Sequence, residues 1–214
     1  ALVIATGATE TVRPRPGWTL DGVSTVGALQ VGLKMTGAAP PGRVILAGNG
    51  PLLFAAGAQL AQAGKPPVAI LEEGRLFSRP WEATRLPAAY LREALGYLSR
   101  LVHARVPVLT GAVVRDIRRD KAGLCLLYER RGKLAELAAD RVGLHDGLAR
   151  NDLGQAFPND LPTRLAGDCN TGLGARAAAI DGENAGREIA ACLAGANDDV
   201  LELAPLLRDG LLAV

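Results

Sequence analysis

One stretch of the sequence constrains the fold more than any other. An apolar run from Arg43 to Ala47 is followed by Gly48-Asn49-Gly50, by an Ala- and Leu-rich segment from Pro51 to Ala63, and by a second apolar run from Pro67 to Leu71. Short continuous apolar runs are typical of strands that are buried on both faces of a parallel sheet. Parallel neighbours need a long crossover between them, usually a helix. The stretch therefore predicts a strand–helix–strand unit with a tight glycine turn after its first strand.

The glycine turn carries the clearest chemical signal in the sequence. Gly48 permits a tight turn after the strand, and Gly50 allows the backbone to approach a pyrophosphate held by the amides at the start of the next helix. Pro51 stands at the first helical position, where a missing N–H costs little. Glu72 ends the next strand, 24 residues after Gly48, close to where a carboxylate that binds a ribose hydroxyl is expected. The predicted nucleotide-binding residues are Gly48, Asn49, Gly50, Pro51 and Glu72.

The same residues leave two alternatives open. A tight turn between strand and helix can exist without a ligand, and Leu53 stands where this motif usually has its third glycine, which serves close packing of helix and strand. The nucleotide could be NAD, NADP or ATP. The Glu72 carboxylate repels a 2′-phosphate and favours NAD, whereas Arg75 would attract a 2′-phosphate.

Further strands and helices are predicted on both sides of this unit. Residues 1–8 are expected to form a strand that ends at Thr6-Gly7, and residues 24–37 a helix with Ser24 as its N-cap and Gly37 at its end. A long helix over 81–104 and a parallel strand over 106–109 follow. Antiparallel strands are expected over 113–118, 124–130 and 134–144, with Arg131-Gly132 as a hairpin turn. Towards the C-terminus we expect a strand over 163–168, a helix over 172–193, a turn over 195–199 and a short helix over 200–212.

Composition and charge argue against several function classes. The formal net charge is +2, and the basic residues are scattered without a block, so no nucleic-acid partner is expected. The sequence contains neither an apolar run of membrane-spanning length nor a signal-peptide pattern, so we expect no membrane association and a cytoplasmic location. The three cysteines, Cys125, Cys169 and Cys192, contain no C-x-x-C pair. We therefore expect no metal site and no dithiol relay, with all three as buried structural thiols in a reducing compartment.

Two strand ends outside the glycine turn resemble those of known flavoproteins. Ala5-Thr6-Gly7-Ala8 ends the first strand, and Leu165-Ala166-Gly167-Asp168 precedes a helix. Together with the glycine turn they are typical of proteins with two dinucleotide-binding folds. The chain resembles the pyridine nucleotide–disulfide oxidoreductase superfamily over nearly its whole length, and within it the α subunits of amino-acid and opine dehydrogenases and of hydrogen cyanide synthase. Two phrases are typical of that branch, Pro16-Gly17-Trp18-Thr19-Leu20-Asp21-Gly22-Val23 and Asp146-Gly147-Leu148-Ala149-Arg150-Asn151.

This resemblance implies an α/β fold with two cofactor sites. A Rossmann-like NAD(P)-binding domain over 23–145, with a parallel sheet and a β-meander, would be inserted into a partial FAD-binding domain made of 1–22 and 146–214. Asp168 would hydrogen-bond the ribityl chain of FAD, Gly167 would let the strand approach it, and Thr6 and Gly7 would lie near its adenine side. Gly48, Gly50 and Glu72 would bind the second nucleotide, NAD(P).

The implied activity is hydride or electron transfer through FAD and NAD(P), with an amine or amino-acid type of small-molecule substrate. A partner β subunit or a homo-oligomer is expected. Two alternatives stay open: a non-catalytic scaffold domain that holds NAD, ATP or ADP, which the departure at Leu53 keeps open, and a fragment that binds nothing.

The chain also departs from the family pattern. The family's FAD fingerprint, Gly-x-Gly-x-x-Gly, lies upstream of the segment that corresponds to residue 1, and the segment 151–163 is shorter than usual. The chain is therefore expected to be a piece of a longer protein, colourless and inactive by itself.

We expect structural roles for the remaining reactive side chains. His103 is expected to end a helix, His145 to pair with Asp146 at the domain junction, and Cys169 to lie near the flavin as a structural thiol.

Overall fold

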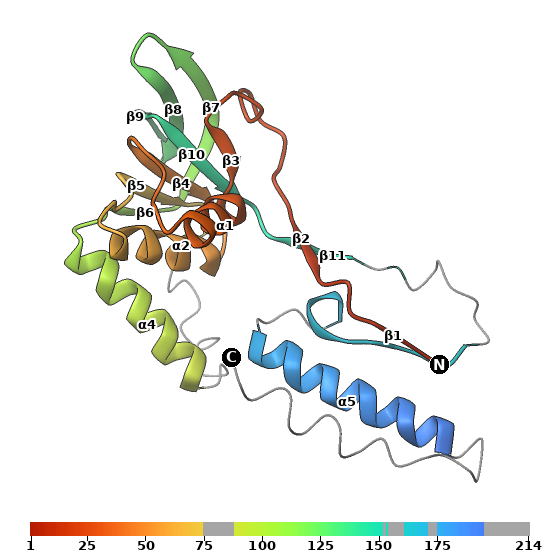
Figure 1. Cartoon of the computed structure of the whole chain (residues 1–214). Helices are drawn as coiled ribbons and strands as arrows, with labels where there is room; N and C mark the ends of the chain where they lie inside the picture. Colours follow the sequence, from red (N-terminus) through yellow and green to blue (C-terminus); the bar gives the residue numbers. More distant parts are fainter. Residues whose placement is uncertain (75–87, 152, 154–160, 171–174, 195–214) are drawn as a thin grey trace. The chain divides into compact units, whose positions relative to one another are not determined.

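The computed structural model describes residues 1–74, 88–151, 153, 161–170 and 175–194, which belong to two compact units (Figure 1). Unit 1 comprises residues 1–9 and 149–214, and unit 2 comprises residues 10–148. The chain passes from one unit to the other along β2 (Ala8–Glu10) and β11 (Leu148–Arg150), which pair in a two-stranded sheet. Residues 10–22 belong to unit 2, where the Ile117 amide donates a hydrogen bond to the Pro16 carbonyl. The assignment of FAD- and NAD(P)-binding domains to these parts stays a prediction.

Unit 2 is built on a five-stranded parallel sheet with the order β3-β10-β4-β5-β6. Its strands are β3 (Val23–Thr25), β10 (Arg141–His145), β4 (Val44–Gly48), β5 (Ala69–Glu72) and β6 (Val108–Thr110). Every residue of β4 and β5 is buried. The expectation that the two apolar runs form doubly covered strands is therefore confirmed.

Helices cover one face of this sheet, and a β-meander covers the other (Figure 1). The helices are α1 (Val26–Thr36), α2 (Pro51–Gln62) and α4 (Ala88–His103). The meander consists of β7 (Ala112–Asp120), β8 (Gly123–Arg130) and β9 (Lys133–Ala139). Alternate residues of β4 point to opposite sides: Leu46 packs with Leu53 and Leu101 from the helices, whereas Ile45 packs with Ile117 from the meander. The predicted α/β fold with a parallel sheet and a meander is confirmed.

Two local predictions in unit 2 are wrong. The apolar segment 134–144 does not form one strand, because the chain breaks at Asp140, whose carboxylate accepts a hydrogen bond from the Arg43 amide at 2.7 Å. The Arg43 side chain and amide lower the pKa of Asp140 to about 2. After this break, β10 enters the parallel sheet between β3 and β4. The N-cap of α1 is Thr25 and not Ser24, since Thr25 accepts from the Ala28 amide at 3.1 Å.

Two turn predictions are confirmed. Gly37 ends α1 with a left-handed backbone (φ +67°). Arg131 and Gly132 form the hairpin turn between β8 and β9 with positive φ at both positions, as a tight hairpin turn of this length requires.

Unit 1 contains a parallel pair of short strands and one long helix. The strand β1 (Leu2–Ile4) pairs with β12 (Thr163–Leu165), which leads through a 3-10 turn, Gly167–Cys169, towards α5 (Ala175–Ala194). The expected turn over 195–199, the helix over 200–212 and the first residues of the long helix, 81–87, lie outside the described residues. Among the described helices, none is long and apolar enough to cross a membrane.

Candidate functional site

The carboxyl ends of the central strands of unit 2 place three predicted or reactive residues side by side. Gly48 at the end of β4 is in register with His145 of β10 on one side and with Glu72 of β5 on the other. Because the strands are parallel, these ends share one edge of the sheet, and ligands of open α/β sheets bind at this edge. The structure therefore brings together Gly48 and Glu72, which were predicted from the sequence, and adds His145.

Both glycines of the turn have backbones that favour glycine. Gly48 has φ +136°, and a Cβ atom at this position would lie 1.8 Å from the carbonyl oxygen of His145. That oxygen also accepts a hydrogen bond from the Asn49 amide at 2.6 Å. Gly50 has φ +114° and is the N-cap residue of α2. The turn thus combines a close approach of two backbones with a helix start that carries no side chain.

The N-terminus of α2 is arranged to receive an anion. Pro51 is the first residue of the helix, the first turn contains no acidic residue, and Gly50 has no side chain that could cap it. The Glu72 carboxylate accepts a hydrogen bond from the Gly50 amide. The first amides of a helix lack partners within the helix and point at ligands that approach its N-terminus. The prediction of a phosphate-compatible helix start is consistent with this geometry.

The missing third glycine has a structural counterpart one helical turn later. Leu53 is fully buried in the core between the helices and the sheet. Gly57 lies on the same side of α2, and a Cβ atom there would meet Ile70 Cδ1 at 2.7 Å and Leu101 Cδ2 at 3.1 Å. Gly57 therefore permits the close packing that the motif normally assigns to position 53. This role was not predicted from the sequence, although the four-residue spacing from Leu53 indicates a shared helix face.

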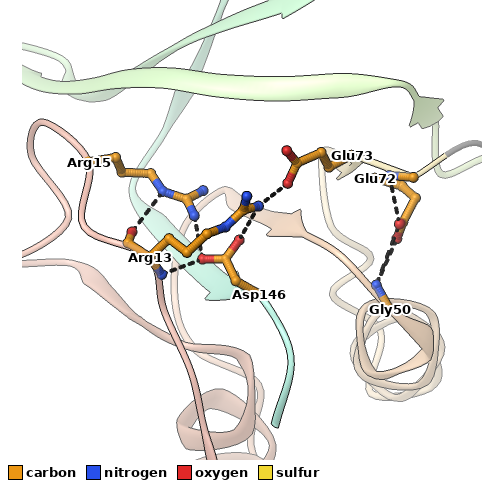
Figure 2. A network of polar contacts seen from close by, with 7 residues as sticks. Arg13, Arg15, Gly50, Glu72, Glu73 and Asp146 are labelled. Atoms are coloured by element: carbon orange, nitrogen blue, oxygen red, sulfur yellow. Dashed lines mark hydrogen bonds and ion pairs between the residues drawn. The ribbon is translucent and has the colours of Figure 1, made fainter. Parts of the chain in front are cut away.

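The Glu72 carboxylate is buried against the glycine turn. Its side chain accepts hydrogen bonds from the Gly50 amide at 3.3 Å and from the Gly74 amide at 3.1 Å (Figure 2). Burial raises the pKa of Glu72, and the hydrogen bonds from the two amides oppose this rise. The carboxylate lies beside Gly50, where a ribose next to the turn could reach it.

A network of arginines and carboxylates lies beside Glu72 (Figure 2). The Asp146 side chain is almost fully buried and accepts from the Arg13 amide at 2.7 Å and from the Arg15 guanidinium. Burial would raise the pKa of Asp146, but its contacts with Arg15 and Arg13 hold it below the usual range. The Arg13 guanidinium also contacts Glu73, the neighbour of Glu72. The expected pair between His145 and Asp146 is therefore wrong, because both arginines occupy the Asp146 carboxylate.

Glu10 is the partner of His145. Its Oε1 atom lies 2.7 Å from Nδ1 of His145, which is only 3% exposed, and its Oε2 atom accepts from the Gly27 amide in the first turn of α1 at 2.8 Å. Burial would raise the pKa of Glu10, but the hydrogen bonds from His145 and from the Gly27 amide contribute to lowering it. Glu10 also lines a pocket of about 280 Å³ together with Trp18. Glu10 was not predicted from the sequence, because it is distant from His145 along the chain.

The predicted residues of unit 1 lie at the ends of its two short strands. The Thr6 hydroxyl donates to the Asn151 carbonyl at 2.5 Å, and the Asn151 amide donates to the Gly7 carbonyl at 3.0 Å. Asn151 Nδ2 donates in turn to the Thr6 carbonyl at 3.0 Å. Asn151 thus fixes the Thr6-Gly7 turn, a role that was not predicted from the sequence.

The Gly167-Asp168 turn contains a buried oxygen without a partner. Among the residues that the structure describes, Asp168 Oδ1 is the one buried side-chain oxygen that accepts no hydrogen bond. Gly167 has φ +76°, and its amide donates to Asp181 of α5 at 2.8 Å. Buried polar atoms are normally paired, so a donor from a ligand would satisfy Asp168.

The three cysteines have different surroundings. Cys169 is buried, and its thiol donates to the carbonyl groups of Ile4 and Ala166, as expected of a structural thiol. Cys125 is half-buried and Cys192 is exposed, so the expectation of three buried thiols is wrong for these two. His103 is the last residue of α4, as predicted.

Comparisons with known proteins identify relatives. No protein-family model matches the chain. The opine oxidase A chain of Rhizobium meliloti strain 1021 is 35% identical over 154 residues, which are 69% of this chain and 34% of that protein. The HcnB component of the hydrogen cyanide synthase of Pseudomonas aeruginosa is 37% identical over 169 residues, 78% of this chain and 33% of that protein. Both relatives are named as subunits, and the chain spans about a third of their length.

Solved structures share the fold. A 2-naphthoyl-CoA reductase in complex with 2-naphthoyl-CoA aligns with a TM-score of 0.65 and 21% identity, over 86% of this chain and 26% of that chain. The thioredoxin reductase of T. acidophilum aligns with a TM-score of 0.62 and 17% identity, over 91% of this chain and 66% of that chain. The fold and the relatives agree with the resemblance found in the sequence. The chain is similar in sequence to the opine oxidase A chains and to HcnB, and it shares the fold of thioredoxin reductase and of 2-naphthoyl-CoA reductase.

Proposed function

We propose that the chain carries the NAD(P)-binding domain, and part of the FAD-binding domain, of one component of an FAD- and NAD(P)-dependent oxidoreductase. The observation that carries this proposal is the carboxyl edge of the parallel sheet in unit 2. There, a two-glycine turn opens a helix whose N-cap residue has no side chain, and Glu72 stands in register with Gly48 and accepts from the Gly50 amide. This is the arrangement that binds a pyrophosphate on helix amides and a ribose on a carboxylate.

In this proposal, the glycine turn contacts the pyrophosphate of the dinucleotide, and Glu72 at the end of β5 contacts a ribose. The pyrophosphate lies at the start of α2, where Leu52 is the first residue of the helix with an N–H, and Gly50 leaves room for it. The Asn49 amide holds the turn to β10, and the Gly50 amide donates to Glu72. Glu72 accepts from the ribose hydroxyls. The carboxylates of Glu72 and Glu73 would repel a 2′-phosphate, which favours NAD over NADP. Arg75, which would attract a 2′-phosphate, lies outside the described residues.

The residues of unit 1 fit one part of a flavin dinucleotide. Asp168 carries the buried carboxylate oxygen without a partner, and a ribityl hydroxyl would supply the missing donor. Gly167 has a positive φ, and a Cβ atom there would meet Ala178 of α5 at 3.4 Å, so glycine lets this turn pack closely on the helix. The Thr6-Gly7 turn would lie towards the adenine. Asp181 holds the Gly167 amide in place from α5.

The reaction and the partners are proposed for the intact protein. Hydride and electron transfer is the chemistry that the two cofactors supply when bound. The substrate class is an amine or amino acid, as the relatives' name opine oxidase suggests, and their designation as subunits supports a partner protein. The chain's own residues bind and orient the nucleotides, and a cytoplasmic location is part of the same proposal.

Calorimetric titration of the chain with NADH, NADPH and ATP tests this function. We expect NADH to bind most tightly and the Gly50→Ala variant to lose binding, because alanine is strained at φ +114° and would disturb the turn that begins α2. The Gly64→Ala variant is the matched control, since Gly64 also has a positive φ but lies beyond the far end of α2. Tighter binding of ATP than of NADH would favour a nucleotide-binding scaffold. Absence of binding of all three ligands would refute both functions.

A further inference from the structure

We infer that Asp181 of α5 is a positioning residue of the flavin site in unit 1. It holds the turn over residues 167–170 in the form that leaves the Asp168 carboxylate free for a hydroxyl group of the ligand. The inference rests on the proposed function, because it assigns to the proposed flavin contact of Asp168 a second residue that acts through the turn. Asp181 belongs to neither of the strand ends from which the flavin site was predicted.

The Asp181 side chain is hydrogen-bonded to both ends of this turn. Its Oδ2 atom accepts from the Gly167 amide at 2.8 Å, and its two oxygens accept from Asn170 Nδ2 at 3.2 and 3.0 Å. Within the turn, the Asn170 amide donates to the Gly167 carbonyl at 2.8 Å. One carboxylate from α5 therefore joins the first and the last residue of the turn, and Asp168 lies between them in the chain.

The turn is also held by packing on α5 and by a contact with β1. Ala178 precedes Asp181 by three residues and shares its side of the helix. A Cβ atom on Gly167 would lie 3.4 Å from the Cβ atom of Ala178, so glycine lets the turn lie close to this side of α5. The buried Cys169 thiol donates to the Ile4 carbonyl of β1 at 3.2 Å. The direction of the Asp168 side chain is thus set by a backbone that two elements anchor.

The carboxylates of Asp168 and Asp181 have different hydrogen-bond partners. Both Asp181 oxygens accept from donors of the protein, whereas Asp168 Oδ1, among the described residues, is buried and accepts no hydrogen bond. A buried oxygen without a partner is costly, and a donor supplied by a ligand removes this cost. A ribityl hydroxyl is a neutral donor of this kind. Asp168 is therefore suited to contact the ligand, and Asp181 to fix the turn that carries it.

Exchange of the two side chains at positions 170 and 181 separates positioning from direct contact. In Asp181→Asn, one oxygen acceptor is replaced by a donor, so the contact with Asn170 is lost while the Gly167 amide keeps its acceptor. In the double variant Asn170→Asp/Asp181→Asn, the amide at position 181 can accept from Gly167 and donate to the carboxylate at position 170. Glu183→Gln is the matched control, because it removes an exposed carboxylate of the same helix that pairs with Arg187.

The side-chain rotamer of Asp168 provides a readout that needs no ligand. Three-bond NMR couplings to its carboxyl carbon report the χ1 angle. We expect a single rotamer in the original chain and in Glu183→Gln, averaging between rotamers in Asp181→Asn, and a single rotamer again in the double variant. Averaging in the original chain would overturn the inference without any variant.

Binding of riboflavin and of lumiflavin connects this positioning to the flavin. Lumiflavin has the same ring system, but a methyl group replaces the ribityl chain. We expect Asp181→Asn to weaken riboflavin binding about tenfold, the equivalent of roughly one hydrogen bond to a charged group. Lumiflavin binding should not change, and the double variant should restore riboflavin binding.

The outcomes distinguish failure of the inference from failure of the proposed function. If Asp181→Asn keeps a single Asp168 rotamer, or binds riboflavin as tightly as the original chain, the inference is wrong while the proposed function stands. If the double variant binds riboflavin as weakly as Asp181→Asn, a role through the turn is wrong. If riboflavin does not bind the original chain, the flavin part of the proposed function fails and the inference fails with it.

Discussion

Replacing Gly48 by alanine tests whether the close contact between β4 and β10 holds the turn in place. A Cβ atom at this position would lie 1.8 Å from the carbonyl oxygen of His145 and 2.6 Å from its carbonyl carbon. Both are main-chain atoms in the middle of a parallel sheet, so the clash cannot be relieved by rotating a side chain. The strands would have to separate at the carboxyl edge of the sheet.

The cost can be estimated from three effects. A left-handed backbone costs about 1–2 kcal/mol when glycine is replaced, and overpacking of a tight site costs about 1–3 kcal/mol. Separation of the strands would also weaken the hydrogen bond from the Asn49 amide to His145, which contributes about 1 kcal/mol. The free energy of unfolding should therefore fall by about 3 kcal/mol or more. Gly64→Ala should cost only the backbone term, because no atom lies within 4 Å of the added methyl group.

Thermal denaturation followed by circular dichroism measures this difference. For a unit of this size, each kcal/mol shifts Tm by about 4 °C. We expect Gly48→Ala to lower Tm by about 12 °C or more, and Gly64→Ala by about 4–8 °C. Equal shifts for the two variants would show that the contact between Gly48 and His145 does not constrain the turn, and would refute the reasoning.

Three further predictions concern single side chains. Thr25→Ala should lower the free energy of unfolding by about 1 kcal/mol in urea denaturation because α1 loses its N-cap, whereas Ser24→Ala should change it by less than about 0.5 kcal/mol. Because the pKa of Glu72 is raised on folding, the contribution of its protonated form is present below the ordinary value of 4.5 and is lost as the pH rises through the raised pKa. The Glu72→Gln variant should therefore gain stability relative to the original chain over this pH range, and a constant difference would contradict the prediction. Asp181→Ala should destabilise unit 1 by about 1–2 kcal/mol and speed hydrogen exchange at the Gly167 amide, which loses its acceptor.

The strand–turn–helix–strand unit could be predicted from the sequence because its determinants are local. Two apolar runs of strand length, a two-glycine turn and an Ala-rich segment fix β4, α2 and β5 without reference to the rest of the chain. The same holds for the hairpin turn at Arg131-Gly132, which Gly132 signals locally and in which both residues adopt positive φ.

The parts that could not be predicted depend on contacts between distant residues. The segment 134–144 is apolar throughout most of its length, so its pattern does not reveal that it breaks at Asp140 and that its second half joins the parallel sheet. Glu10 pairs with His145, and Arg13 contacts Asp146. These residues meet only because β10 enters the parallel sheet between β3 and β4. Which residues form these pairs depends on the order of the strands in the sheet and not on their spacing along the chain.

Neighbouring residues of similar chemistry also limit such predictions. Ser24 and Thr25 are both good N-cap residues, and a shift of one residue in the start of α1 exchanges their roles. The role of Gly57 was not predicted, because the motif places the glycine for close packing at position 53. In this helix the glycine stands one turn later.

The most direct test of nucleotide binding at the glycine turn is a titration of the chain with NADH, followed by the backbone amide resonances of Gly48, Asn49, Gly50 and Leu52. We predict saturable shifts at these amides, together with a shift at Glu72, at concentrations where other amides of α2 move little. Saturable shifts confined to another part of the sheet, or no shifts at all, would contradict the assignment of the site.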